Sequence, residues 1–436
     1  MQSKAEAEVV WRVRRGMDRR FRSGHPWVYS NELMESPKGV EPGAVVQLQD
    51  ASGGFLARGF GNSNSLISFR ALTRDPQVLE PVSTENLVDA LVRSHGLRVQ
   101  AGFGGVSHRL CYGESDGLPG WVIDRYFLRS GQVFVIQAHT AGADGLLVRW
   151  EEILKGFLAR VKNAPHWDGV AVVLRNDVGV RVREGLQDEE PRVLKAISGL
   201  NLKSVEIAVR SVQDADPLWF RVDLEGGQKT GFFLDQFSNI QIAANAFKSF
   251  EFAGGSSNRV VKILDLCCYV GQWSAQLAAV FAAQGRKVEV VAVDASARAL
   301  EFAKVNVEAQ GAQFESLCGN VLKDLVSLPD QGFDLVISDP PALIKARKDI
   351  SVGTRAYLQL ATQVFRLVRR GGGVVCCSCS ALLEEESFIE AQAKAIQRNS
   401  VKVQWIARGS QSPDHPVLAE FPEGRYLKGW MGAVAP

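Results

Sequence analysis

The second half of the chain, from about residue 225, alternates apolar runs that predict buried strands with segments of helical periodicity. The predicted strands cover residues 263–266, 288–293, 335–337 and 373–377, and the predicted helices cover residues 275–283, 297–309 and 357–368. Such alternation is typical of an α/β fold, in which helices cover both faces of a mostly parallel, Rossmann-like sheet. Ligands of such sheets bind beyond the carboxyl ends of the strands, so the residues that follow each strand are the candidates for a site.

The first two of these strands end in residues that suit a nucleoside ligand. The first contains Asp265 and runs into a turn with a single glycine, Gly271, and the second ends at Asp294. A carboxylate at Asp294 could accept hydrogen bonds from both hydroxyls of a ribose, in a dinucleotide or in another nucleoside. A dinucleotide, however, requires a G-x-G-x-x-G turn whose N–H groups hold the pyrophosphate. Tyr269 and Trp273 crowd the present turn, which favours a ligand without phosphate.

The later strands are followed by an acid and a thiol. Asp339 precedes two prolines, Pro340 and Pro341, and Cys379 lies 40 positions further on, between two serines. A thiolate can add to a heteroaromatic ring, and an acid can bind the polar edge of the ring. Cys376 lies inside the apolar strand with Cys377, where we expect both thiols to pack as small hydrophobic groups.

The first half of the chain predicts two further domains. Short apolar runs at residues 44–48, 54–57 and 66–70, separated by Gly, Asn and Ser, predict a small β barrel over residues 1–80. Residues 81–224 predict an α+β domain with strands at 133–136 and 170–174 and a helix at 146–160. A further helix is expected to begin at Thr84, with Thr84 itself as the N-cap. Residues 225–436 then form the α/β domain.

The charge of the chain is balanced, so any nucleic-acid binding depends on a local patch. The formal net charge is +2 over 436 residues, and the dense basic cluster is a run of arginines between residues 12 and 22 that is followed by aromatic residues. Basic side chains interleaved with aromatic ones suit phosphate contact and base stacking, although the same arginines could form an ordinary solvated surface. The predicted RNA-binding residues are Arg14, Arg15, Arg19, Arg22, His25 and Trp27.

The seven cysteines and the apolar segments indicate a cytoplasmic protein. The cysteines do not follow the pattern of a secreted disulfide framework, and the N-terminus lacks the apolar core of a signal peptide. No apolar stretch is long enough to cross a membrane. The C-x-x-C formed by Cys376 and Cys379 lacks two further ligands at zinc spacing, so neither a metal site nor a redox pair is predicted.

Several long strings in the chain resemble one family. They are RSGHPWVYS (residues 22–30), GESDGLPGWVIDRY (113–126), KTGFFLDQ (229–236), DHP (414–416) and PEGRYLKG (422–429). Together with the motifs at Gly271, Asp294 and Asp339, they resemble the PUA-domain-containing 23S ribosomal RNA cytosine-5 methyltransferases over nearly the whole chain. The resemblance implies a PUA barrel, a central domain and a methyltransferase domain that uses S-adenosylmethionine. The implied partner is large-subunit ribosomal RNA, naked or in an early assembly, and a homodimer is left open.

The resemblance also implies roles for individual residues. Cys379 would be the nucleophile that adds to carbon 6 of cytosine, and Asp339 would hydrogen-bond the ring nitrogen or the exocyclic amine. The residues implied for the cofactor are Gln236, Asp265, Tyr269, Gly271, Asp294, Asn320, Asp339 and Pro340. The chain departs from the family at Phe237, where an arginine is usual, and at Asn320, where an acid is usual.

Two other readings remain open from the sequence. One is a guanine methyltransferase of the same fold that forms no covalent adduct and needs no cysteine after Asp339. The other is a non-catalytic RNA-binding or ribosome-assembly protein with a degenerate cofactor pocket, which the departures at Phe237 and Asn320 would suit.

Overall fold

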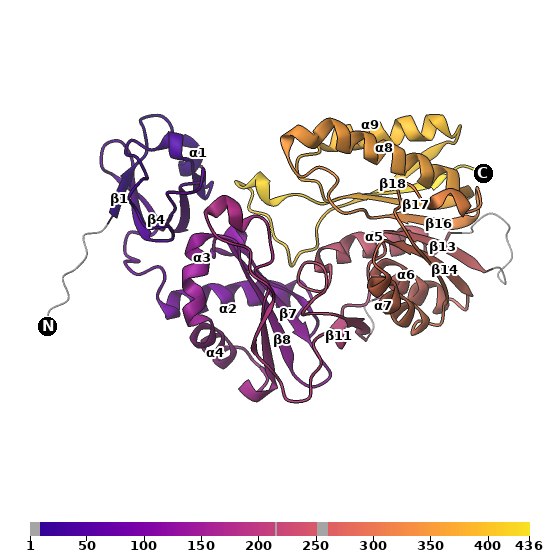
Figure 1. Ribbon diagram of the computed structural model, residues 1–436, viewed down its shortest axis with the longest axis horizontal. Helices are drawn as coiled ribbons and strands as arrows, with labels where there is room; N and C mark the ends of the chain where they lie inside the picture. The colour runs from indigo at the N-terminus through magenta and orange to yellow at the C-terminus, as the bar shows by residue number, and fades with distance from the viewer. Residues whose placement is uncertain (1–8, 214–215, 251–259) are drawn as a thin grey trace. The chain divides into compact units, whose positions relative to one another are not determined.

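The computed structural model describes residues 9–213, 216–250 and 260–436, which form two compact units (Figure 1). Of these, the first unit comprises residues 9–203 with two segments from further along the chain, Asp223–Gly231 and Asp414–Gly424. The second unit comprises the remaining described residues. Division into three domains at residues 80 and 224 stays a prediction.

The N-terminal part of the first unit is a five-stranded sheet in the order β1-β3-β4-β5-β2, around a core that includes Trp11, Phe21, Leu48 and Phe69. Its elements are β1 (Val9–Arg12), α1 (Arg19–Arg22), β2 (Trp27–Val28), β3 (Val45–Gln49), β4 (Phe55–Gly61) and β5 (Phe69–Thr73). The strand expected at residues 66–70 begins later, because Ser65 and Ser68 form a hydrogen-bonded turn in which the Ser68 hydroxyl donates to the Ser65 carbonyl.

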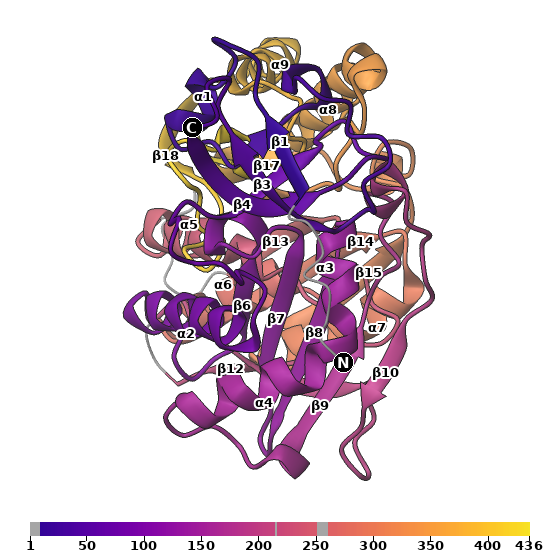
Figure 2. The same cartoon turned by 90° about the vertical axis from the view of Figure 1, so that its left-hand side faces the viewer.

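The central part of the first unit is a second five-stranded sheet, whose order β10-β9-β8-β7-β6 can be followed in Figure 2. The strands are β6 (His108–Tyr112), β7 (Trp121–Phe127), β8 (Gln132–Ala138), β9 (Val170–Leu174) and β10 (Arg192–Lys195). Two helices, α2 (Thr84–Gln100) and α4 (Trp150–Arg160), pack together and contribute to one apolar core with the sheet. A short helix, α3 (Ala141–Gly145), and a 3-10 turn precede α4. The N-cap of α2 is Ser83, whose hydroxyl accepts from the Asn86 N–H, so the assignment of the cap to Thr84 was one residue too late.

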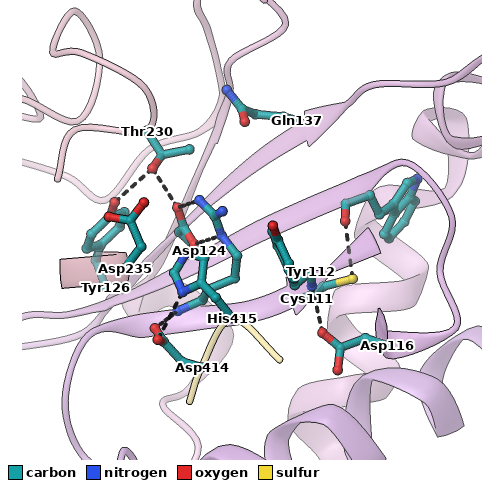
Figure 3. A network of polar contacts seen from close by, with 12 residues as sticks. Cys111, Tyr112, Asp116, Asp124, Tyr126, Gln137, Thr230, Asp235, Asp414 and His415 are labelled. Carbon is teal, nitrogen blue, oxygen red and sulfur yellow. Dashed lines mark hydrogen bonds and ion pairs between the residues drawn. The ribbon is translucent and has the colours of Figure 1, made fainter. Parts of the chain in front are cut away.

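Buried polar contacts attach the two distant segments to the central part of the first unit (Figure 3). The Thr230 hydroxyl donates to Asp124 at 2.5 Å, and Asp124 also accepts two hydrogen bonds from the Arg109 guanidinium at 2.8 and 2.9 Å. The Asp414 carboxylate accepts from the backbone N–H of Arg109 at 2.9 Å, and the Asp414 carbonyl accepts from Arg98 at 2.9 Å. Both segments are therefore integral to the first unit.

The second unit is built on a seven-stranded sheet in the order β15-β14-β13-β16-β17-β19-β18. Its strands are β13 (Val261–Leu266), β14 (Val288–Asp294), β15 (Gln313–Cys318), β16 (Phe333–Ser338), β17 (Val368–Ser378), β18 (Val403–Gly409) and β19 (Lys428–Val434). The first five are parallel, and β19 pairs antiparallel with both β17 and β18. A separate hairpin joins β11 (Val205–Val209) to β12 (Leu218–Val222). The mostly parallel sheet confirms the predicted fold class.

Helices cover both faces of this sheet. In Figure 1, α5 (Phe237–Phe247), α6 (Gln272–Ala282) and α7 (Ala297–Glu308) lie on one face, and α8 (Ile350–Leu367) and α9 (Glu385–Arg398) lie on the other. Helix α6 begins at Gln272, three residues before the predicted start. Gly271, with φ = 75°, is its N-cap, so the helix follows the glycine turn directly. No helix among the described residues combines the length and apolar character needed to cross a membrane.

Candidate functional site

Three carboxylates come to one edge of the parallel sheet in the second unit. Strand β13 lies between β14 and β16, and the register aligns Leu266 with Val293 on one side and with Ser338 on the other. The strands therefore end level with one another, which brings Asp265, Asp294 and Asp339 to the same edge. This is the point where the strand order reverses, the usual ligand-binding position of such sheets.

The turn after β13 adopts a strained backbone. Cys267 and Tyr269 have φ values of 63° and 49°, in the left-handed region that costs a residue with a Cβ roughly 1–2 kcal/mol. The turn is held because the Tyr269 N–H donates to Asp294 at 2.9 Å. A Cβ atom on Gly271 would lie 3.1 Å from the Cβ atom of Ala303, so the glycine also lets α7 pack against the turn. Strain of this kind is often found where a backbone shapes a binding site.

Asp265 is a buried carboxylate with one oxygen unused. Its Oδ2 accepts from the Ser274 hydroxyl at 2.8 Å and from the Ser274 N–H at 3.3 Å, whereas Oδ1 has no hydrogen-bond partner among the described residues. Burial, with smaller contributions from the charges of Asp339 and Asp294, raises the pKa of Asp265 to about 7, although the Ser274 hydrogen bonds oppose the shift. A buried polar atom without a partner is a candidate ligand contact.

Asp339 is held by two side chains that donate to its carboxylate. Gln236 Nε2 lies 2.8 Å from each Asp339 oxygen, and Trp273 Nε1 donates to Oδ2 at 3.0 Å. The Gln236 amide oxygen in turn accepts from Asn239 at 2.7 Å, which fixes the orientation of the amide. The Gln236 side chain thus holds Asp339, and its predicted contact with the cofactor stays a prediction.

The predicted nucleophile and the predicted acid lie on adjacent loops. Cys379 follows β17 directly, is half-buried, and its thiol donates to the carbonyl of Pro340 at 3.7 Å. Tyr357, from α8, lies between the two flanking serines, with its hydroxyl 2.9 Å from the Ser378 hydroxyl and 3.0 Å from that of Ser380. The serines therefore fix the loop that presents the thiol.

The two cysteines inside β17 are buried, as expected of packing residues. Cys376 and Cys377 are each 2% exposed, and burial raises the pKa of the Cys376 thiol to about 12 and that of Cys377 well above its ordinary value. Burial also raises the pKa of the Cys267 thiol, assisted by the charges of Asp294 and Asp339. Within the described ranges, no group of three or more His, Cys, Asp or Glu residues is placed to bind a metal ion.

Asn320 lies at the end of β15, where its amide oxygen already accepts the Leu322 N–H at 2.8 Å and its own N–H donates to Asp324 at 2.7 Å. The side chain therefore shapes the loop, and its predicted contact with the cofactor stays a prediction.

Half of the arginines in the basic cluster of the first unit have acidic partners. Arg12 pairs with Glu35, Arg20 with Glu32, and Arg22 with both Asp18 and Asp50. Arg14 Nε donates to the Leu33 carbonyl at 2.7 Å. The guanidinium groups of Arg15 and Arg19 have no such partner among the described residues.

His25 and Trp27 pack within the first unit. His25 is 3% exposed, and its Nε2 lies 3.2 Å from both carboxylate oxygens of Glu423. The Trp27 indole donates to Glu114 at 2.7 Å, and the Arg70 guanidinium lies over its ring. These contacts give both residues a structural role, and RNA contact by either stays a prediction.

An open cavity of about 500 Å³ lies beside α1 in the first unit. Basic and acidic side chains line it together: Gly16, Met17, Arg19, Arg20, Ser23, His25, Glu32 and Glu420. Arg19 is exposed, and its guanidinium has no acidic partner among the described residues. The Arg19 guanidinium is therefore available to a ligand of this cavity.

Sequence reasoning did not find three contributors to the site in the second unit. They are the indole of Trp273 on Asp339, the hydroxyl of Tyr357 on the cysteine loop, and Lys428, whose ammonium donates to the Ser380 carbonyl at 3.1 Å. Their partners lie between 21 and 66 positions away in the sequence, so local patterns carry no signal for them.

Two stretches of the chain match known domain families. Residues 12–74 match the PUA-like domain family, and residues 257–421 match the Methyltransferase domain family. In fold, the chain is similar to the solved structure of SMU.776 complexed with SAH, with a TM-score of 0.70 at 16% identity, covering 98% of this chain and 100% of that one.

Two relatives match almost from end to end. Ribosomal RNA large subunit methyltransferase I of Photobacterium profundum is 31% identical over 95% of this chain and 97% of its own length. The protein of the same name from Klebsiella pneumoniae is 30% identical over 96% of this chain and 97% of its own length. The resemblance inferred from the sequence is thereby confirmed at the level of the family and its PUA-like and methyltransferase domains. The chain belongs to the family of ribosomal RNA large subunit methyltransferase I.

Proposed function

We propose that this protein transfers a methyl group from S-adenosylmethionine to carbon 5 of a cytosine in large-subunit ribosomal RNA. The names of the relatives support the class of substrate, and the methyltransferase domain supports the class of reaction. The choice of cytosine carbon 5 rests on one observation, the half-buried Cys379 thiol on the loop beside Asp339 and Pro340.

The residues at the edge of β13 suit S-adenosylmethionine. Asp265, Asp294 and Asp339 supply negative charge for a ligand that carries a sulfonium, an ammonium and a ribose diol. The unused Oδ1 of Asp265 can accept one further hydrogen bond, and SAH in the similar fold of SMU.776 agrees with a ligand of this kind. When bound, S-adenosylmethionine supplies an electrophilic methyl group. We infer that Tyr269, Gly271 and Pro340 shape this part of the pocket.

Carbon 5 of cytosine is a weak nucleophile, and Cys379 would activate it. Addition of the thiolate to carbon 6 forms an S–C bond and moves ring electrons towards carbon 5. Carbon 5 can then take the methyl group, with S-adenosylhomocysteine as the leaving group. Turnover requires loss of the carbon 5 proton to a base and cleavage of the S–C bond to Cys379, which restores both the aromatic ring and the thiolate. A half-buried thiol on a fixed loop suits this cycle, since the nucleophile must be reachable and must not rotate away.

Asp339 would bind the polar edge of the same ring. Two donors, from Gln236 and Trp273, already hold its carboxylate in one orientation, so no reorganisation is needed when the base arrives. A carboxylate accepts hydrogen bonds, which suits the exocyclic amine of cytosine and not the carbonyl that replaces it in uracil.

The cavity beside α1 is the proposed RNA contact of the PUA-like domain. Arg19, which lines the cavity, and Arg15, four positions before it, would contact phosphate or a base edge, since their charges are not neutralised by a neighbouring acid among the described residues. Arg22 would contribute less, because Asp18 and Asp50 already neutralise it.

A covalent trap tests the proposed chemistry. Ribosomal RNA containing 5-fluorocytosine should form a stable complex with the protein, because fluorine at carbon 5 cannot leave as a proton does. Cys379→Ala should abolish both the trap and methyl transfer while leaving binding of S-adenosylhomocysteine intact. Cys318→Ala, which removes an exposed thiol, is the matched control and should behave as the wild type.

Two outcomes would redirect the assignment. Wild-type turnover in Cys379→Ala would refute the covalent route and favour a non-covalent guanine methyltransferase. Binding of S-adenosylhomocysteine with no methylation of any RNA would favour a non-catalytic ribosome-assembly protein. Base-resolved mapping of 5-methylcytosine in cells with and without the gene then identifies the nucleotide.

A further inference from the structure

Lys428 lies on the strand that pairs with the end of the cysteine-bearing strand. In the antiparallel ladder between β17 and β19, Lys428 is the residue opposite Ser378, which immediately precedes Cys379. Its ammonium donates to the Ser380 carbonyl, on the other side of Cys379, at 3.1 Å and to the Tyr426 carbonyl at 3.4 Å. A positive charge is thus fixed beside the three-residue loop that carries the thiol.

The ammonium retains capacity for a further partner. It has three N–H donors, of which the two carbonyls use two in the described structure. Lys428 is half-buried, and burial lowers its pKa, whereas the charges of Glu385, Cys379 and Glu384 raise it. Glu385 is itself engaged by Arg408 and by the Trp430 indole, so it is not available to neutralise Lys428 alone.

Several titratable groups beside the thiol oppose its ionisation. Cys379 acts electrostatically on Cys267, Cys377, Tyr357 and Lys428, and of these four only Lys428 is a base. Asp339 and Asp235 place negative charge beside Cys377, two positions before Cys379. Since the thiolate, and not the thiol, is the nucleophile, a nearby cation is required to offset this acidic surrounding.

We propose that Lys428 is the positioning residue that holds a positive charge beside Cys379 and stabilises its thiolate. In the resting protein the S–H bond donates to the Pro340 carbonyl. On ionisation the proton passes to solvent, the hydrogen bond to Pro340 is lost, and the remaining N–H of Lys428 offers the thiolate a replacement. This role rests on the function proposed above, but the charge effect on the thiol can be measured without RNA or cofactor.

The test is the pH dependence of Cys379 alkylation by iodoacetamide, followed by mass spectrometry of the peptide that contains Cys379. The main variant is Lys428→Gln, which keeps a donor for the Ser380 carbonyl but removes the charge. In this variant the pH at which Cys379 reaches half its maximal alkylation rate, the alkylation midpoint, should rise by about one pH unit or more. In Lys428→Arg the midpoint should return most of the way to the wild-type value. Lys428→Met provides a second neutral variant if Lys428→Gln does not fold.

Two controls identify a specific effect. Alkylation of the exposed Cys318 serves as an internal reference in every variant and should not change. Lys394→Gln removes a lysine that is exposed on α9 and paired with Glu390, and it should leave the Cys379 midpoint unchanged. An unchanged midpoint in a folded neutral variant of Lys428 would overturn the proposal. If the midpoint shifts but Cys379→Ala still methylates RNA, the proposed covalent function fails while the charge effect of Lys428 stands.

Discussion

We expect the buried carboxyl of Asp265 to make binding of the cofactor dependent on pH. With a pKa of about 7, about nine tenths of this group is protonated at pH 6 and about one tenth at pH 8. A ligand that donates a hydrogen bond to the unused Oδ1 favours the ionised form. We therefore expect binding of S-adenosylhomocysteine to release nearly one proton at pH 6 and close to none at pH 8.

The affinity should change accordingly. If the bound carboxyl is ionised throughout, the dissociation constant falls about tenfold between pH 6 and pH 8, which corresponds to about 1.4 kcal/mol. The stability of the unliganded protein should instead fall as the pH rises. Because the folded pKa of Asp265 lies above the unfolded value, the group's contribution to stability is complete below pH 3.8 and is lost as the pH rises through about 7.

Calorimetric titrations in two buffers of different ionisation enthalpy, at pH 6 and at pH 8, measure the released protons directly. Asp265→Asn is the control, since it keeps an acceptor for Ser274 but cannot ionise. It should bind more weakly and lose the difference between the two pH values. Equal proton release by the wild type at pH 6 and pH 8 would refute the assignment of this pKa to ligand binding.

Three further outcomes are expected. Tyr357→Phe should cost about 1–2 kcal/mol of stability, measured by urea unfolding, because two buried serine hydroxyls lose a partner, and it should also slow methyl transfer; wild-type stability would contradict the role of the hydroxyl. The double variant Arg15→Gln and Arg19→Gln should weaken RNA binding and reduce its salt dependence by more than Arg22→Gln does, and equal effects would return these arginines to a solvated surface. Cys377→Ala should lower the free energy of unfolding by about 1–2 kcal/mol through lost packing. Methyl transfer per folded molecule should be unaltered, because this thiol takes no part in the reaction.

Much of the fold of the second unit could be predicted from local patterns. Strands β13, β14, β16 and β17 contain the predicted apolar runs, because a strand buried on both faces has a continuous hydrophobic signature. The antiparallel addition of β18 and β19 could not be predicted. Strand β18 alternates half-buried with exposed residues at the sheet edge, and its pairing with β19 joins segments about 20 residues apart.

The chemistry of the candidate site could be proposed from the sequence, but the contacts that orient its residues could not. Asp339 and Cys379 were identifiable because an acid and a thiol follow strand ends, where function concentrates in this architecture. The groups that orient them come from other elements: Trp273 from α6, Tyr357 from α8 and Lys428 from β19. Each of these contacts is set by packing between elements, which a single sequence does not reveal.

The first unit includes a segment from far along the chain, Asp414–Gly424, and this affects how the protein can fold during synthesis. The chain is made from its N-terminus, yet the carboxylate that accepts from the Arg109 N–H and the carbonyl that accepts from Arg98 both belong to Asp414. The ribosome must therefore reach Asp414, 305 positions after Arg109, before the earlier part of the unit can satisfy these donors. A nascent chain or a fragment that ends before Asp414 exposes an unfinished unit, so the early-made part of this unit depends on residues made much later to finish folding.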